Sequence, residues 1–489
     1  MLINTSSIKK ILKQHWLVSV FLVVYVALLS FKIITHKTPF YNWDESIYAQ
    51  AGREMIRNQF YIAPMWQGQV WHDKPPLPSL IYGLVQVLIP VEPEISTRLV
   101  SLFIGMTILV LVYRIYFKIE GNKAISFLAV VLTAFVPSFL QRAQIVNVDI
   151  FLLLGWLGYV VFFNNYWISL VFLAVAVLSK SLLGFYPPVI YGVFILLRLF
   201  LKQITWEDFK KLIYKILSQV LIVSIWYVMM FFLFGKPFWQ MHIVESHLKR
   251  VTASIESHFG KRTFYIDLLF KELGIFAYGS ILGLFMVFYS FMKQKNYKSL
   301  MLRTFFVPWF LFLNLTKTKI EWYIYPVVSQ FAYLSVFTLL TVKKYKYIYT
   351  LSITLVTVFV LYQNLEGGKL LSTQYSTSDD PYKMAMFVKS NCANLNYLVS
   401  PETRDTYKTL QGMNLTITTT SWWGDEPRIV YYSDRPVTII YDKAQLVDKI
   451  SRNEGDCFSI EDRDIDGTID IRNYKMSKRF NDLLLYEHK

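Results

Sequence analysis

The sequence is poor in charged residues, which make up only 17% of its 489 residues, against 54% hydrophobic residues. Acidic residues are scarcest in the first 365 residues, which hold 15 of the 34 in the chain. This composition excludes an ordinary water-soluble globular protein. The excess of lysine and arginine lies in the same apolar part. Bases beside apolar segments are typical of a membrane surface, and nothing in their distribution indicates a nucleic-acid partner.

Cysteine is almost absent from the chain. Cys392 and Cys457 are the only two, and both fall in the C-terminal segment. They could form a disulfide bond if that segment lies outside the cytoplasm, and would remain free thiols if it faces the cytoplasm. The residues alone leave both alternatives open.

Histidine is also scarce, and three of the seven histidines, His242, His247 and His258, fall within residues 235–270. Such a group is a candidate for metal ligation. Its spacings of five and eleven residues, however, do not match the helical pattern of a metalloprotease. We therefore do not predict a zinc site from these histidines.

Alternation of polar and apolar residues is missing from the first 365 residues, which excludes membrane-spanning strands. The apolar runs are instead continuous, and many have roughly 18 to 22 residues, enough to cross a hydrocarbon core of about 30 Å. The run at 14–35 has no small-residue cleavage site and predicts a first spanning helix rather than a removable signal. The predicted fold class is therefore a mainly α, polytopic helical membrane protein.

The apolar runs predict about eleven spanning helices. The run Leu77–Ile89 is too short to span and is followed by prolines, so it predicts a re-entrant or surface helix. Basic linkers between the later helices all fall on one side, which the positive-inside rule makes cytoplasmic. The predicted helices lie at about 15–35, 95–117, 123–141, 150–164, 166–180, 184–201, 214–234, 271–292, 303–316, 322–342 and 347–364.

The composition becomes mixed and polar after Leu365. We predict two domains: a transmembrane domain, 1–365, and a small extracytoplasmic α/β domain, 366–489. Short β-prone runs and helix-like stretches alternate in the second domain. The predicted strands are 396–400, 416–420 and 437–441, and the predicted helices are 384–390 and 443–451.

The first outer loop, 36–77, carries four acids, an unusual number for a connector in so apolar a chain. The carboxylate of Asp44 could take a proton from an acceptor hydroxyl that attacks a sugar carbon. The structural alternative is that Asp44 is the N-cap of a helix over 45–56. Glu45 suits the first-turn helix dipole and is assigned a supporting role.

Several basic side chains on the same outer side are candidates for binding a phosphate. Lys74 stands before two prolines that fix the backbone, with Asp73 placed to orient it. The alternative for Lys74 is an interfacial lysine. His247 and Arg250, three residues apart, would share a helical face for phosphate or acceptor binding.

Three further positions complete the candidate residues. Lys319 and Tyr323 are four residues apart, so on a helix they would point the same way and could hold a phosphate, or belong to an interfacial aromatic belt. Asp149 stands at the head of an apolar helix, where capping and metal ligation are the alternatives. Lys180 lies between two apolar runs and suits a loop near the headgroups.

These motifs resemble membrane glycosyltransferases that use polyprenyl-phosphate-linked sugars, similar to the protein O-mannosyltransferase and lipid A aminoarabinose transferase families of GT-C fold. The resemblance covers about residues 10–345 and is strongest in the first loop. The matching positions are Asp44-Glu45, Tyr48-Ala49, Glu54-Met55, Gly68, Lys74-Pro75-Pro76-Leu77, Arg98-Leu99, Asp149, Ser179-Lys180 with Gly184, His247 with Arg250, and Lys319, Tyr323 and Pro326.

The resemblance implies roles for these residues. It makes Asp44 catalytic and Lys74, Arg250 and Tyr323 ligands of the lipid phosphate. For some family members it also implies a divalent metal, here near Asp149 and Asp73; no other cofactor is indicated.

The chain departs from the family pattern at two positions. Ile47 stands where the aminoarabinose branch has arginine, and Asp73 replaces a glutamate. Both departures weaken an assignment to lipid A modification in particular, and the C-terminal domain matches no family motif.

We therefore predict an inverting glycosyltransferase in a bacterial inner membrane. It would move a sugar from a polyprenyl-phosphate donor to a lipid, glycan or protein acceptor on the outer face of the membrane. Membrane lipids would be its other partners. The alternative is a transporter or flippase of lipid-linked sugars or sugar phosphates. A transporter would need ionisable residues or helix breaks near the bilayer midplane, whereas the charges here stand at the ends of the predicted helices.

Overall fold

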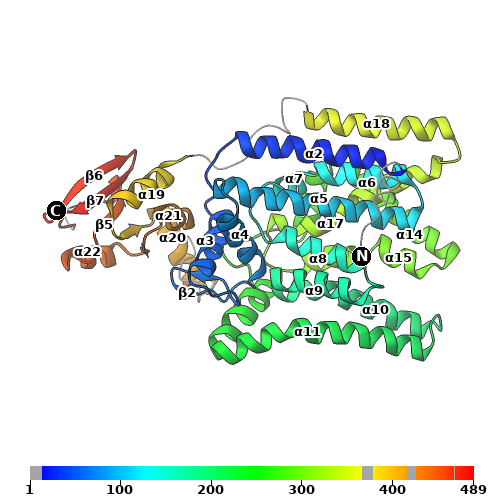
Figure 1. The fold of residues 1–489 in the computed structure, drawn as a ribbon, viewed down its shortest axis with the longest axis horizontal. Helices are drawn as coiled ribbons and strands as arrows, with labels where there is room; N and C mark the ends of the chain where they lie inside the picture. The colour runs from blue at the N-terminus through cyan, green and yellow to red at the C-terminus, as the bar shows by residue number, and fades with distance from the viewer. Residues whose placement is uncertain (1–13, 366–377, 416–425, 467–468) are drawn as a thin grey trace. The chain divides into compact units, whose positions relative to one another are not determined.

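A computed structural model describes residues 14–365, 378–415, 426–466 and 469–489 (Figure 1). The chain divides into two compact units. The first unit comprises Met1–His36, Arg98–Phe234 and Gly260–Gln374. The second comprises Lys37–Thr97, Gly235–Phe259 and Tyr375–Lys489.

The first unit is built from helices. Within the described residues, seven helical segments are long and apolar enough to cross a membrane, which makes this a multi-pass membrane protein. In Figure 1 the axes of the long helices of this unit are nearly parallel, and α2 and α5 run in opposite directions. The helical elements are α2 (Trp16–Thr35), α5 (Pro93–Glu120), α6 (Lys123–Phe135), α7 (Pro137–Arg142), α8 (Asp149–Val161), α9 (Tyr166–Lys180), η1 (Ser181–Phe185), α10 (Tyr186–Phe200), α11 (Trp206–Phe238), α13 (Phe264–Leu273), α14 (Phe276–Gln294), α15 (Tyr297–Arg303), α16 (Val307–Leu315), η3 (Glu321–Ile324), α17 (Tyr325–Phe337), η4 (Thr338–Val342) and α18 (Lys346–Leu365).

The predicted helical fold class is confirmed, and each of the eleven predicted ranges contains a helix. Their boundaries differ where proline intervenes. The range 123–141 is divided into α6 and α7 because Pro137 has no amide hydrogen with which to continue the ladder of α6. The count of eleven spans remains a prediction, since several of these helices are shorter than a membrane is thick.

Helix α17 is the centre of the first unit. All of its residues are buried, including Tyr325, Gln330 and Tyr333. It packs against α6, α8 and α14. A helix that is buried on every side needs no polar face, which explains why Tyr325–Phe337 has little amphipathic pattern.

The apolar stretch 166–200 is two helices, α9 and α10, joined by η1, which packs against α9. Ser181 has φ 55°, outside the helical region, and η1 follows it. A Cβ atom on Gly184 would lie 2.6 Å from the carbonyl carbon of Ala176, so only glycine lets the returning chain contact α9 this closely. The two separate helices predicted for this stretch are therefore confirmed.

The second unit combines α3 and α4 with a small α/β domain. Its elements are α3 (Asp44–Arg57), β1 (Met65–Trp66), β2 (Gln69–Val70), α4 (Leu77–Leu88), η2 (Trp239–Lys249), α12 (Arg250–Thr252), α19 (Asp380–Asn391), β3 (Leu395–Leu398), α20 (Pro401–Gly412), α21 (Pro427–Ser433), β4 (Val437–Ile440), α22 (Lys443–Ser451), β5 (Cys457–Glu461), η6 (Asp462–Asp464), β6 (Tyr474–Phe480) and β7 (Leu483–His488). The five-stranded sheet has the order β4-β3-β5-β7-β6.

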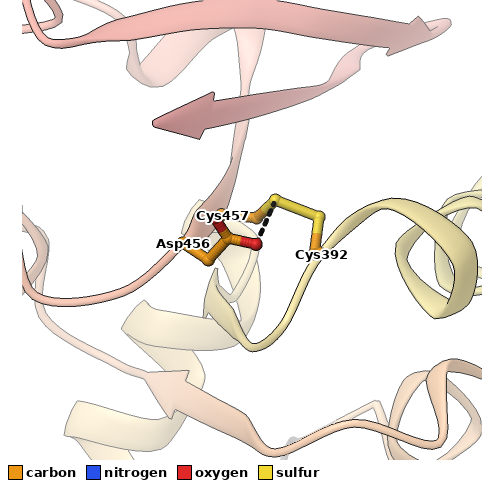
Figure 2. Close-up of side chains that lie close together, drawn as sticks. All are labelled: Cys392, Asp456 and Cys457. Atoms are coloured by element: carbon orange, nitrogen blue, oxygen red, sulfur yellow. Dashed lines mark hydrogen bonds between the residues drawn. A yellow bond between two sulfur atoms is a disulfide. The ribbon is translucent and has the colours of Figure 1, made fainter. Parts of the chain in front are cut away.

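The small C-terminal α/β domain is confirmed, although the sequence analysis found only part of its sheet. Strands β3 and β4 pair in parallel at two of the predicted positions, whereas the predicted strand 416–420 lies outside the described residues. Strand β5 and the antiparallel strands β6 and β7 were missed. The sheet buries Phe458 and Leu484 in a shared core, and Cys392 and Cys457 form a disulfide bond beside it (Figure 2).

The C-terminal segment packs on α3. Arg57 forms two hydrogen bonds to Asp434, of 2.6 and 3.0 Å. Arg53 donates to the Tyr431 carbonyl at 2.7 Å, and its guanidinium lies 4.2 Å from the Tyr431 ring centroid. The first-loop helix and the C-terminal residues are therefore parts of one compact unit.

Helices α3 and α4 cross with backbone against backbone. A Cβ atom on Gly52 would overlap the Ser79 carbonyl oxygen and lie 2.7 Å from the Gly83 nitrogen. A Cβ atom on Gly83 would meet Gly52 in the same way. Because neither contact is with a flexible side chain, the crossing requires glycine at both positions.

Gly52→Ala is expected to lower the free energy of unfolding by about 2 kcal/mol or more, because α3 and α4 must separate to admit the methyl group. Gly192→Ala on α10 is the matched control, since no atom lies within 4 Å of its Cβ position. Thermal unfolding of the detergent-solubilised protein measures both. Equal unfolding temperatures for the two variants would contradict the close crossing.

Candidate functional site

Asp44 occupies the first turn of α3. The helix begins at Asp44 itself, with Trp43 at the N-cap position, so the alternative in which Asp44 caps the helix is wrong. Glu45 is fully buried, and its carboxylate accepts a hydrogen bond of 2.9 Å from the Tyr41 amide. Glu45 therefore fixes the entry to the helix, and the partly exposed Asp44 is the carboxylate of this pair that a reactant can approach.

Asp73 is a buried carboxylate in the same unit. It forms an ion pair with Lys74 and accepts a hydrogen bond from the hydroxyl of Ser246. A buried charge is stable only when it is paired and hydrogen-bonded, so Asp73 holds the Lys74 ammonium in place. The predicted orienting role of Asp73 agrees with this geometry.

The partner Ser246 lies on η2, a π-helix that follows the break at Gly235 and Pro237. In a π-helix the backbone pairs residues five apart. The ring nitrogen Nδ1 of His247 also contacts the backbone carbonyl of His242 at 2.6 Å, and the two rings are 5.4 Å apart. These histidines do not belong to the group of residues with metal-ligand spacing among the described residues.

A second charge pair adjoins Asp73. The guanidinium of Arg250 donates to Glu256 at 3.0 Å, and Arg250 also acts electrostatically on Asp73. His258 in turn feels the charges of Glu256, Arg250 and Asp44. The charged residues 44, 73, 74, 250, 256 and 258 are thus linked within the second unit.

The pKa values follow from burial and these charges. Burial alone raises the pKa of Asp73, but the positive charges of Lys74 and Arg250 outweigh it and hold the pKa below its usual range. Burial lowers the pKa of His258, while the negative charge of Glu256 opposes that shift. Asp73 is therefore a permanent anion at neutral pH, and His258 is neutral there.

Three predicted residues meet in the first unit. Asp149, only 2% exposed, begins α8 and forms an ion pair with Lys180, the last residue of α9. The Lys180 ammonium also lies 4.6 Å from the ring centroid of Tyr323. Arg142 lies over the neighbouring Trp322 ring at 4.6 Å. Lys180 is therefore fixed by a carboxylate and an aromatic face, rather than lying loose in a loop.

Lys319 has a different setting from the one predicted. It precedes η3, so the expectation that it shares a helical face with Tyr323 is wrong. Its ammonium donates to the carbonyls of Leu313 and Asn314 at 3.0 and 3.1 Å, and it is 5% exposed. Lys319 caps the C-terminal end of α16, where orphan carbonyls favour a cation.

Asp73 and Asp149, the two predicted metal ligands, are each paired with a lysine, and a divalent metal at either carboxylate stays a prediction. Lys74 contacts one carboxylate oxygen of Asp73, and Lys180 contacts one of Asp149. Among the described residues the group with metal-ligand spacing is Cys392, Asp456 and Cys457, whose sulfur atoms are joined in the disulfide (Figure 2). We therefore derive no chemical step through a metal.

Glu426 is a partly buried carboxyl group that the sequence analysis missed. It precedes α21, and one of its oxygen atoms is buried with no hydrogen-bond partner among the described residues. Its neighbour Arg428 donates its amide to the side chain of Asn42 at 3.3 Å, two residues before Asp44. Burial raises the pKa of Glu426 to about 7, against the opposing charge of Arg428.

Comparison with known proteins gives the fold of this chain. Residues 73–229 match the family model of the dolichyl-phosphate-mannose-protein mannosyltransferases. An uncharacterized protein of Aquifex aeolicus (strain VF5) is 25% identical over 298 residues, which cover 59% of this chain. The matched region spans 57% of the length of that relative.

The similarity to solved structures extends over nearly the whole chain. ArnT from Cupriavidus metallidurans, in a crystal structure bound to undecaprenyl phosphate, has a TM-score of 0.68 at 12% identity, covering 96% of this chain and 97% of ArnT. The Archaeoglobus fulgidus oligosaccharyltransferase, in complex with Zn and sulfate, has a TM-score of 0.56 at 14% identity, covering 85% of this chain and 62% of that protein. The predicted GT-C fold and resemblance are confirmed.

The raised pKa of Glu426 has a consequence for stability. Its pKa is about 7 in the folded protein, against an ordinary value of 4.5 for a free glutamate side chain. The protonated Glu426 side chain therefore stabilises the folded protein. Its contribution to the free energy of unfolding is fully present below pH 4.5 and is lost as the pH rises through 7. Glu426→Gln is expected to remove this decline, which amounts to about 3 kcal/mol.

Unfolding temperatures of the wild type and Glu426→Gln, measured from pH 5 to pH 8.5, test this expectation. The exposed Glu402, which pairs with Arg463 in the same domain, provides the control Glu402→Gln, which should keep the decline. Parallel curves for the wild type and Glu426→Gln would show that Glu426 is not the titrating group.

Proposed function

We propose that the protein is an inverting glycosyltransferase that moves a sugar from a polyprenyl-phosphate donor to an acceptor hydroxyl. The observation that carries this proposal is the grouping of charges in the second unit. There the approachable carboxylate of Asp44 belongs to the same linked set as the fixed cations Lys74 and Arg250. The match of 73–229 to a mannosyltransferase family model supports the donor class.

The proposed reaction is a single displacement. Asp44 accepts the proton of the acceptor hydroxyl while that oxygen attacks the anomeric carbon of the sugar. The bond between the anomeric carbon and the phosphate oxygen breaks, and its electron pair leaves with the lipid phosphate. One displacement inverts the configuration, and the leaving phosphate needs no proton when cations hold it.

Lys74 and Arg250 are proposed to be those cations. An ammonium carries three N–H donors and a guanidinium five, so each can bind a phosphate oxygen and still retain its carboxylate partner. Charge-assisted bonds of this kind are short and strong in a partly dehydrated site. The bound undecaprenyl phosphate of ArnT, whose fold this chain has, supports a lipid phosphate as the ligand. His247 is retained as a proposed acceptor-side residue.

The same chemistry is proposed for Lys180 and Tyr323 of the first unit. A lysine held by the buried Asp149 beneath an aromatic ring presents a fixed positive charge, and the Tyr323 hydroxyl adds a donor. Lys319 is excluded from this proposal because its ammonium caps α16.

The outer face of a bacterial inner membrane is proposed as the place of reaction. The disulfide between Cys392 and Cys457 supports this orientation, because such bonds persist in oxidising compartments. The second unit holds both this disulfide and Asp44, so the two would share one compartment. A transporter is disfavoured because Asp149 and Lys180 stand at helix ends rather than in mid-span.

Asp44→Asn is expected to reduce sugar transfer by a factor of about 10² to 10⁴, because the amide cannot accept the acceptor proton. Mass spectrometry of candidate acceptors, with a polyprenyl-phosphate sugar supplied to purified protein, measures the product. Glu92→Gln is the control, since Glu92 is an exposed acid of the same unit paired with Lys37. Unchanged turnover in Asp44→Asn would refute the proposed base.

Lys74→Gln is expected to weaken donor binding by roughly 10- to 150-fold, the value of one charge-assisted hydrogen bond. Lys74→Arg should restore part of it, because the partner of Asp73 is then kept. Donor titration measures the affinity, and the unfolding temperature separates binding from folding. The exposed Lys37→Gln serves as control. Full affinity in a folded Lys74→Gln protein would remove Lys74 from the site.

A further inference from the structure

A small cavity of about 140 Å³ lies in the first unit among the C-terminal ends of α5, α8 and α10 and the helix α15. Its charged lining consists of basic side chains contributed by three of these helices, and no acidic residue among those that the structure describes lines it. The basic residues are Arg114, Lys118, Arg198 and Lys298.

These four bases have no carboxylate partner among the described residues. The acids nearest to them in sequence are already engaged. Glu120 binds Arg303 at 2.8 Å, and Glu207 binds Lys210 at 2.8 Å. Asp208 accepts from the Thr205 hydroxyl at 2.9 Å. The cavity is therefore a concentration of uncompensated positive charge.

Aromatic rings hold the two arginines near the cavity. The Arg114 guanidinium lies 4.8 Å from the ring centroid of Phe162, and that of Arg198 lies 5.8 Å from Phe194. Lys215 donates to the carbonyl of Phe163, a lining residue. Stacking restricts the side chains, so less conformational entropy is lost when an anion binds.

The remaining lining is mostly apolar. Val160, Ile195 and Leu302 contribute to the walls beside the charged groups. A free anion gains nothing from such walls, whereas a phosphate attached to acyl chains gains from both parts of the lining. The combination fits an anionic headgroup that remains part of a lipid.

The cavity is separate from the charged cluster at Asp149. Asp149 begins α8, and the cavity residues Val160 and Val161 end it. Thirteen residues of α-helix place these ends about 20 Å apart. Lysines follow the ends of α5 and α10 at positions 123 and 202, and the positive-inside rule would turn this side toward the cytoplasm, where a bacterial membrane carries anionic lipid.

We infer that this cavity is a binding site for the phosphate headgroup of an anionic phospholipid, with Arg114, Arg198 and Lys298 as its main ligands. The site is independent of the transfer reaction. A bound lipid would join α5, α10 and α15 at their ends and stabilise the first unit.

Binding is tested with the full-length protein in mixed micelles. Native mass spectrometry and thermal unfolding are followed as phosphatidylglycerol or phosphatidylcholine is titrated, and inorganic phosphate is titrated in a parallel series. We expect saturable binding and a higher unfolding temperature with phosphatidylglycerol only. Each removed base should weaken binding roughly fivefold, so Arg198→Gln with Lys298→Gln should weaken it at least tenfold.

The matched control removes the same charge elsewhere. Lys343→Gln with Lys344→Gln, at two exposed linker positions, should bind phosphatidylglycerol like the wild type. If the first double variant does not fold, the exposed single change Lys298→Gln takes its place, with the fivefold loss expected. Equal affinities of both variants, or equal stabilisation by inorganic phosphate, would overturn the assignment to a lipid.

Discussion

Buried carboxylates that each hold a basic side chain are the constraint on which this structure depends. Asp73 holds Lys74, Asp149 holds Lys180, and Glu120 holds Arg303 at 2.8 Å. Removing one partner of such a pair leaves a buried charge and costs about 3–5 kcal/mol. The pairs therefore fix the ends of helices and loops, and they place positive charge where an apolar chain would otherwise carry none.

The fold could be predicted from run lengths and the rules of membrane solvation. Continuous apolar runs must be helices when no water is available to the backbone, so every predicted range contained one. The small C-terminal sheet was harder, because β6 carries exposed charges such as Lys475 and the apolar run of β7 has only four residues, too few to distinguish a strand from a helix. The glycine crossing of Gly52 and Gly83 could not be predicted, since it depends on two helices that are adjacent only in space.

The residue types of the candidate site could be predicted from the sequence. Which of these side chains contact one another could not. Lys180 was expected in a loose loop, yet it is fixed between Asp149 and the ring of Tyr323, residues distant in sequence. The misplacement of Lys319 came from assuming a helix that begins only at Glu321. Ser246 was missed because a π-helix brings it to Asp73, and a period of 3.6 residues does not reveal that geometry.

In the proposed transfer reaction, the pairing of cations with carboxylates would let the phosphate site favour reaction over tight binding. A pair such as Lys74 with Asp73 has little net charge, so it attracts a singly charged sugar phosphate only moderately. When the bond to the sugar breaks, the phosphate gains a second negative charge, and its interaction with the lysine becomes stronger. Interactions that strengthen toward the transition state raise the rate, whereas equal binding of both states does not. A cation held rigidly by a buried acid is already positioned for the transition state and needs no reorganisation.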